Sequence, residues 1–191
     1  DDKVTLRMAV AALTADPYLT GTNGYRRIVF DLPADKLTIK LKKTLEIARG
    51  PNSCELCGLT ALGTVTLAAE NPTGNYPLMT VKDDVTISYV RFLCPTRTHG
   101  SPAGIDQWGY FCSLDLYDCV FEGGSTPERG CALYCRTGGH STRAVNCTFV
   151  GQKGGGSVYC VNMYSRFLNC SFIGNDASNM SDPSGSAVFA P

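Results

Sequence analysis

The stretch AVNCTF at residues 144–149 sets the pattern of the chain, because three segments align with it without gaps: ISYVRF (87–92), LYDCVF (116–121) and FLNCSF (167–172). Their final phenylalanines lie 29, 28 and 23 residues apart. A second set of similar segments falls between them: GYFC (109–112), ALYC (132–135), SVYC (157–160) and AVFA (187–190). Two sets that recur in step indicate an internal repeat of about 23–30 residues, which is typical of solenoids and propellers.

Each repeated segment has the composition of a strand, because it is short, β-branched or aromatic, and bounded by turn-forming residues. The third residue of each segment in the first set is expected to form a sharp corner, since Asn and Asp tolerate the left-handed conformation. This corner column comprises Tyr89, Asp118, Asn146 and Asn169. A corner in every repeat predicts an all-β, right-handed parallel β-helix, a solenoid whose coils pair with one another. An up-and-down β-sandwich is the alternative.

Equivalent residues of successive coils should stack about 4.8 Å apart, with side chains alternating between the core and the surface. We therefore expect two inward stacks of rings, one of Phe92, Phe121, Phe149 and Phe172, and one of Phe111, Tyr134, Tyr159 and Phe189. Two columns of buried free thiols should accompany them, because parallel side chains that point the same way oppose the torsion of a disulfide. These columns are Cys119, Cys147 and Cys170, and Cys112, Cys135 and Cys160.

The pattern resembles the right-handed β-helix repeats of chlamydial polymorphic membrane proteins and autotransporter passengers. That type carries one Gly-Gly-Ala-Ile element and one Phe-x-x-Asn element in each turn. Residues 172–175 (FIGN) fit the second element, and three segments are relaxed versions of the first: GCAL (130–133), GGSV (155–158) and GSAV (185–188). The resemblance covers about residues 78–190 and implies a displayed β-helix rod.

The N-terminal third fits the same architecture. Residues 5–13 place Leu6, Val10 and Leu13 on one helical face, with Thr5 as N-cap. Strands are expected at residues 27–32, 37–41 and 44–47. A helix followed by such strands resembles the cap and first coils of secreted bacterial β-helices. We therefore predict one continuous domain, with the cap helix and first coils at residues 1–77 and the repeated coils at residues 78–191.

Composition excludes several classes of protein. Charged residues make up 18% and apolar residues 43% of the 191 residues, which argues against disorder. Seventeen basic and seventeen acidic residues cancel, so the sequence lacks the basic excess of a nucleic-acid binder. No apolar run reaches the roughly 18 residues of a membrane span.

The ten cysteines favour an oxidising compartment, and hence a secreted or surface location. The C-x2-C pair Cys54 and Cys57 is expected to lie in a loop and to form a disulfide. A zinc site of these two residues with Cys131 and Cys135 is the less favoured alternative, and we assign no metal ligand and no cofactor. Of the three N-x-S/T sequons, only Asn179 is a convincing glycosylation site, because Asn146 and Asn169 are expected at corners.

No catalytic residue can be assigned from the sequence. Glycoside hydrolysis needs two carboxylates about 5–10 Å apart. The candidates are Asp115, Asp118 and Glu122, but Asp118 is expected to be a corner residue, and Asp83 and Asp84 are expected in a turn. Arg91, Arg143 and Arg166 have no recurring acidic cluster opposite them. His99 and His140 lie in Gly/Ser/Thr-rich stretches without an evident partner.

The remaining interpretation is a secreted or cell-surface structural and interaction protein, an adhesin-like or passenger-like rod. Insertions of unequal length, at residues 94–106, 123–130 and 175–185, should leave one side of the rod and form its binding face. The expected partner is a host or neighbouring surface protein or a glycan. The last repeat ends at Pro191 without a cap, which predicts continuation of the chain or self-association through the C-terminal coil. A polysaccharide-active lyase or glycoside hydrolase is the alternative function.

Overall fold

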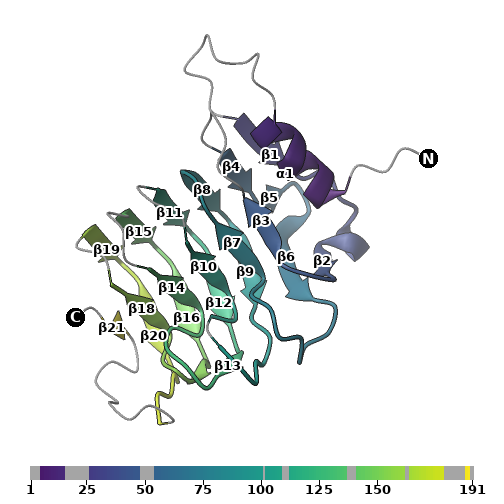
Figure 1. Cartoon of the computed structure of the whole chain (residues 1–191). Coiled ribbons are helices and arrows are strands. Elements are labelled where there is room, and N and C mark those ends of the chain that lie inside the picture. The colour runs from purple at the N-terminus through teal and green to yellow at the C-terminus, as the bar shows by residue number, and fades with distance from the viewer. Residues whose placement is uncertain are drawn as a thin grey trace.

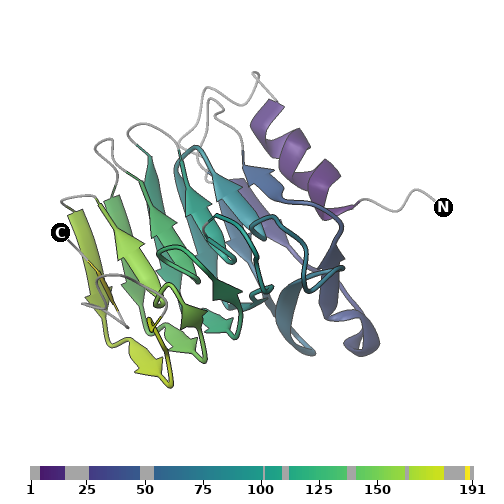
Figure 2. The same ribbon diagram turned by 60° about the horizontal axis from the view of Figure 1, so that its bottom comes forward.

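The computed structural model describes residues 5–15, 26–47, 54–100, 102–108, 112–136, 141–161, 164–178 and 188–189. Three parallel sheets run the length of these residues and enclose one core, so the chain is a parallel β-solenoid (Figures 1 and 2). One short helix, α1 (Leu6–Ala15), lies at its N-terminal end. Within the described residues, no helix is long and apolar enough to span a membrane.

Each sheet takes one strand from each successive coil. Sheet A contains β1 (Arg26–Val29), β4 (Cys54–Cys57), β8 (Val85–Ser88), β11 (Ser113–Tyr117), β15 (Ser141–Val145) and β19 (Tyr164–Leu168). Sheet B contains β2 (Thr38–Leu41), β6 (Gly63–Ala69), β9 (Val90–Leu93), β12 (Val120–Glu122), β16 (Thr148–Val150) and β20 (Ser171–Ile173). Sheet C contains β3 (Leu45–Ile47), β7 (Met79–Val81), β10 (Ile105–Gln107), β14 (Leu133–Cys135), β18 (Val158–Cys160) and β21 (Val188–Phe189).

The four coils from β8 onward are the most regular. Each runs from sheet A through a tight corner into sheet B, and then through a longer connection into sheet C. These connections also pair with one another, because β13 (Ser125–Thr126) is parallel to β17 (Lys153–Gly154). The earlier coils carry two small additions, the 3-10 helix η2 (Ala34–Lys36) and β5 (Leu59–Thr60), which is antiparallel to β6.

The corner between sheets A and B is made by one left-handed residue in each regular coil. The φ angles are 54° at Tyr89, 52° at Asp118, 56° at Asn146 and 51° at Asn169. Their side chains form a ladder along the rod: Asn146 Nδ2 donates to Asp118 Oδ1 at 3.2 Å, and Asn169 Nδ2 donates to Asn146 Oδ1 at 2.8 Å. Two of the three sequon asparagines therefore belong to this ladder, and Asn179 lies outside the described residues.

The phenylalanines that end the first set of segments stack on one another in the core. Ring centroids are 4.6 Å apart for Phe92 and Phe121, 5.0 Å for Phe121 and Phe149, and 4.8 Å for Phe149 and Phe172. The planes of each pair lie within 7° of parallel, because the strands are paired in register. The first three rings are fully buried, whereas Phe172 on the last described strand of sheet B is only half-buried.

Helix α1 covers the N-terminal end of the core. Thr5 is its N-cap, since Thr5 Oγ1 accepts a hydrogen bond from the backbone N–H of Met8 at 3.2 Å. Val10 is buried in the core, with Leu6 and Ala9 packed beside it. Arg7 fixes the helix against the first coil by donating to the carbonyl oxygens of Lys43 and Thr44.

All ten cysteines are described, and all are free. The predicted Cys54–Cys57 disulfide is wrong, because these residues lie on strand β4 rather than in a loop. Three residues along a strand span about 10 Å, beyond the roughly 4.4–6.8 Å between Cα atoms that a disulfide needs. Cys54 joins the core, whereas Cys57 lies on the opposite face of β4 beside Arg27.

The cysteine columns are partly as expected. Cys119, Cys147 and Cys170 each precede paired residues of β12, β16 and β20, and therefore lie in one column. Cys135 pairs with Cys160, and their sulfurs are 3.2 Å apart. Cys112 does not continue this column, because Gln107 occupies the equivalent position and Cys112 lies in the connection to sheet A.

We expect these thiols to remain reduced in the purified protein. Burial raises the pKa of Cys119 and of Cys135 well above the usual value, so one thiol of each neighbouring pair stays protonated. The hydrogen bonds from these two thiols lower the pKa of their partners Cys147 and Cys160. Alkylation by iodoacetamide in denaturant, without reductant, should therefore add ten carbamidomethyl groups by intact mass. A shortfall of two or more groups that prior reduction restores would show a disulfide and contradict this expectation.

Candidate functional site: an aromatic–arginine ladder on sheet C

The outer face of sheet C carries an ordered row of polar and aromatic side chains. Asp106, Tyr134 and Tyr159 are paired in register on β10, β14 and β18. The residues that flank the two tyrosines on their strands belong to the core cluster: Leu133, Cys135, Val158 and Cys160. Because strand side chains alternate, both tyrosines point away from the core.

The predicted second inward stack is therefore wrong in its direction. Tyr134 and Tyr159 do stack, with centroids 5.1 Å apart, but on the side of sheet C that faces away from the core, where Tyr134 is partly exposed and Tyr159 is buried beneath Arg129. Phe189 pairs with Tyr159 along the backbone, and Phe111 lies outside the described residues. The column position expected for Phe111 is held by Asp106, since β10 pairs with β14 five residues earlier than the sequence alignment places it.

Arg136 is fixed at the centre of this face. Its Nε and Nη2 donate to Oδ1 and Oδ2 of the buried Asp106, each at 2.9 Å, which is a bidentate ion pair. Its guanidinium carbon lies 3.7 Å from the ring centroid of Trp108 and 5.0 Å from that of Tyr134. The guanidinium thus contacts two rings while its charge is neutralised by the aspartate.

Arg129 contacts the ladder near Tyr159. Its guanidinium carbon is 5.0 Å from the centroid of Tyr159, and its Nη1 donates to the Tyr159 hydroxyl at 2.7 Å. Neighbouring backbone holds the Arg129 segment in place, because the N–H of Gly130 donates to the carbonyl of Gly155 at 2.9 Å. We name this set of side chains the aromatic–arginine ladder: Trp108, Arg136, Tyr134, Tyr159 and Arg129.

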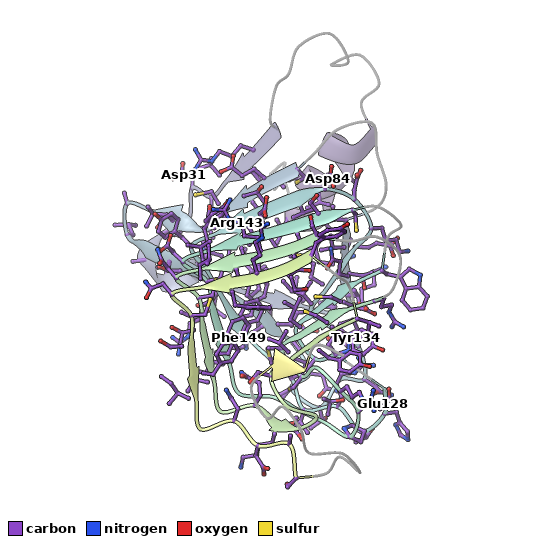
Figure 3. The ribbon with its side chains drawn as sticks, turned by 90° about the vertical axis from the view of Figure 1, so that its left-hand side faces the viewer. Asp31, Asp84, Glu128, Tyr134, Arg143 and Phe149 are labelled. Atoms are coloured by element: carbon purple, nitrogen blue, oxygen red, sulfur yellow. The ribbon has the colours of Figure 1, made fainter. Side chains whose placement is uncertain are left out.

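Trp108 is the exposed member of the aromatic–arginine ladder. It is the single tryptophan of the chain, and 52% of its surface is accessible although one face packs on Arg136. Burial raises the pKa of Tyr134, against the lowering effect of Arg136, so its hydroxyl remains a hydrogen-bond donor at neutral pH. In Figure 3, Tyr134 and Glu128 lie on one side of the solenoid and Arg143 lies on another.

This arrangement has the residue types of a binding surface. Trp, Tyr and Arg are the residues that most often dominate binding energy at protein interfaces. Side chains held rigid before binding lose little conformational entropy when a partner docks. Within the described part of the chain, no group of three His, Cys, Asp or Glu residues could hold a metal ion.

The carboxylates named from the sequence have separate environments. Asp118 belongs to the corner ladder, and Glu122 forms an ion pair with Arg91. Asp84 Oδ1 accepts a hydrogen bond from the N–H of Ser113 at 2.6 Å, which brings it towards Asp115 of the next coil. Burial raises the pKa of Asp115, Arg143 lowers it, and Asp84 raises it. The carboxylate of Asp84 thus acts on the carboxyl group of Asp115, which lies on the adjacent coil.

The named histidines do not form a catalytic pair in the described structure. His99 is exposed, and its Nδ1 lies 2.9 Å from Thr98 Oγ1 and 3.4 Å from Asn75 Nδ2. His140 lies outside the described residues. Comparison of the chain with protein-family models, with curated proteins and with solved structures gives no match.

Sequence reasoning missed most of the aromatic–arginine ladder. The pairing of β10 with β14 brings Trp108 and Asp106 next to Arg136. The segment at residues 127–132 reaches β18 and places Arg129 on Tyr159. One signal was present in the sequence: Gln107-Trp108 and Cys135-Arg136 occupy equivalent positions in their coils, so an aromatic ring and a cation are adjacent. An alignment that placed residue 104 against residue 132 would have predicted the contact.

Proposed function

We propose that this solenoid is a secreted or surface-displayed interaction protein, adhesin-like or passenger-like in character, that binds a neighbouring protein or glycan through the aromatic–arginine ladder. The observation that carries the proposal is the half-exposed Trp108 held against Arg136, which is itself fixed by Asp106. An exposed ring that is already ordered is costly for solubility and favourable for binding.

The connections between sheets B and C support this proposal. They precede β10, β14 and β18, so they lie at the edge of the sheet that carries the ladder. They are ordered by contacts with one another: β13 pairs with β17, and Thr96 forms a bridge with Ser125. A rigid row of loops beside an aromatic face gives a partner one continuous surface.

Replacing Trp108 with alanine is expected to weaken partner binding by tenfold to a hundredfold, because hot-spot truncations at interfaces commonly cost about 2 kcal/mol or more. The partner is first selected on an array of defined glycans and purified surface proteins, and the affinity is then measured by calorimetry. Ile173→Ala is the matched control, since Ile173 is equally exposed but lies on sheet B. Equal affinities for the two variants would contradict the proposal.

A polysaccharide-active enzyme is the second candidate, and the carboxylate of Asp84, which raises the pKa of Asp115 on the next coil, favours it. A carboxyl group with a raised pKa is suited to act as a general acid. The arrayed glycans are therefore also tested for cleavage. Cleavage that Asp115→Asn abolishes and Trp108→Ala spares would support the enzyme in place of the interaction protein.

Self-association through the C-terminal coil stays a prediction. Among the described strands, β19 and β20 are the last of sheets A and B, and Phe167 and Phe172 are only partly buried there. Helix α1 covers the opposite end of the core. Two copies would therefore meet through like ends, around a two-fold axis, rather than head to tail.

A further inference from the structure

Sheet A has a second surface of distinct chemistry on its outer face. Arg143 of β15 and Arg166 of β19 are paired in register, and both side chains are exposed. Strands in a sheet lie about 4.8 Å apart, so two positive charges stand side by side. Like charges directly opposite each other destabilise a strand pair. An arrangement that lowers stability in this way is expected at a functional site, where ligand binding offsets the repulsion between the two charges.

The two arginines differ in the partners available to them. Arg143 lies next to Asp115 in the same column, and its guanidinium carbon is 5.6 Å from the ring centroid of Tyr117. Arg166 has no carboxylate within ion-pair distance among the described residues. The column therefore ends in uncompensated positive charge, although the whole chain has a formal charge of zero.

The side chains around this pair carry hydroxyl groups and rings. Ser113 and Ser141 are paired next to the arginine column, and Tyr164, 60% exposed, continues their row on β19. The backbone groups inside a sheet are used in strand pairing, so a ligand on this face is recognised by side chains alone. Stacking on a tyrosine ring, hydrogen bonds to hydroxyls and a guanidinium pair suit an anionic sugar polymer better than an acidic peptide.

We infer that the Arg143–Arg166 pair is an oxyanion-binding site for an acidic polysaccharide, whose carboxylate or sulfate groups lie between the two guanidinium groups. The site is separate from the aromatic–arginine ladder, which lies on sheet C. Its occupancy does not depend on the interaction proposed for that ladder.

The test uses the whole chain and four polymers: polygalacturonate, which carries carboxylates, dextran sulfate, neutral dextran, and poly-glutamate as the acidic peptide. At low salt, wild type should bind at least one of the two acidic polysaccharides, weaken as ionic strength rises, and ignore neutral dextran. The double variant Arg143→Gln/Arg166→Gln should lose at least tenfold in affinity. Preference for one acidic polysaccharide tells whether the carboxylate or the sulfate is the natural group.

The matched control is Arg91→Gln, because it removes an exposed arginine of sheet B that is already paired with Glu122. The affinity of Arg91→Gln for the acidic polysaccharides should stay within about twofold of wild type, whereas that of Arg166→Gln should fall. This difference separates a specific binding site from a general effect of removing one positive charge. A cooperative thermal unfolding transition is used to check that each variant is folded. Any one of three results would overturn the inference. Folded wild type binds neither acidic polysaccharide, Arg91→Gln and Arg166→Gln lose the same affinity, or poly-glutamate binds more tightly than both acidic polysaccharides.

Discussion

Replacing Phe149 with alanine is expected to lower the free energy of unfolding by about 3–5 kcal/mol. The ring is fully buried between Phe121 and Phe172, and Phe167 packs against its edge with centroids 6.3 Å apart. Neighbouring rings are held by the register of their strands, so they cannot close the cavity. Urea unfolding followed by circular dichroism measures the change.

Phe172→Ala is the matched control for this variant. It removes the same side chain from the next coil, where the ring is only half-buried, so its cost should be clearly smaller. Equal losses at the two positions would show that the stack does not have the buried centre described here.

Gly155→Ala is expected to cost about 3 kcal/mol or more, because the added methyl group meets backbone rather than a movable side chain. A Cβ atom at residue 155 would lie 1.4 Å from the carbonyl oxygen of Glu128. The segment of Glu128 and Arg129 would have to move, and Arg129 would then leave Tyr159. The same urea titration measures the loss of stability.

Gly151→Ala is the control that separates a steric clash with backbone from the strain of a side chain at positive φ. Gly151 has a φ of +71°, but no atom lies within 4 Å of the position of a Cβ. Alanine there should cost only the strain of a left-handed residue, about 1–2 kcal/mol. If Gly155→Ala proves no more costly than Gly151→Ala, then the coils are not packed as closely as the structure describes.

The regular corner of the solenoid could be predicted from the sequence because its chemistry is local. Only a few residue types tolerate positive φ, and Asp118, Asn146 and Asn169 recur at one position before a phenylalanine of the stack. Tyr89 follows from the same alignment, although its residue type gives no such indication. The core rings are then set by the two-residue period of strands.

The outer face of sheet C could not be predicted in the same way. Cys112 resembles Cys135 and Cys160 in its sequence context, but it lies in the connection to sheet A, five residues after Gln107, which pairs with Cys135. A shift of five residues exchanges the inner and outer faces of a strand. The partner of each surface residue therefore depends on strand register, which residue types alone do not reveal.

The C-x2-C pair shows a different limit. Its spacing suggested a local disulfide, but the backbone pairs Cys54 with Val85 and Cys57 with Ser88 in sheet A. The long-range pairing of β4 with β8 thus overrides a local motif. The sequence before the pair, Pro51, Asn52 and Ser53, favours a turn, and it gave no indication that a strand begins at Cys54.

The emission of Trp108 tests the central claim most directly, because this residue is the only tryptophan of the chain and lies at the exposed end of the aromatic–arginine ladder. The partner selected on the array is titrated into the protein while emission and acrylamide quenching are recorded. Binding should produce a saturable change in Trp108 emission and a clear fall in acrylamide quenching. The partner concentration at half of this change should agree with the dissociation constant measured by calorimetry. Calorimetric binding that leaves both signals of Trp108 unchanged would contradict the account.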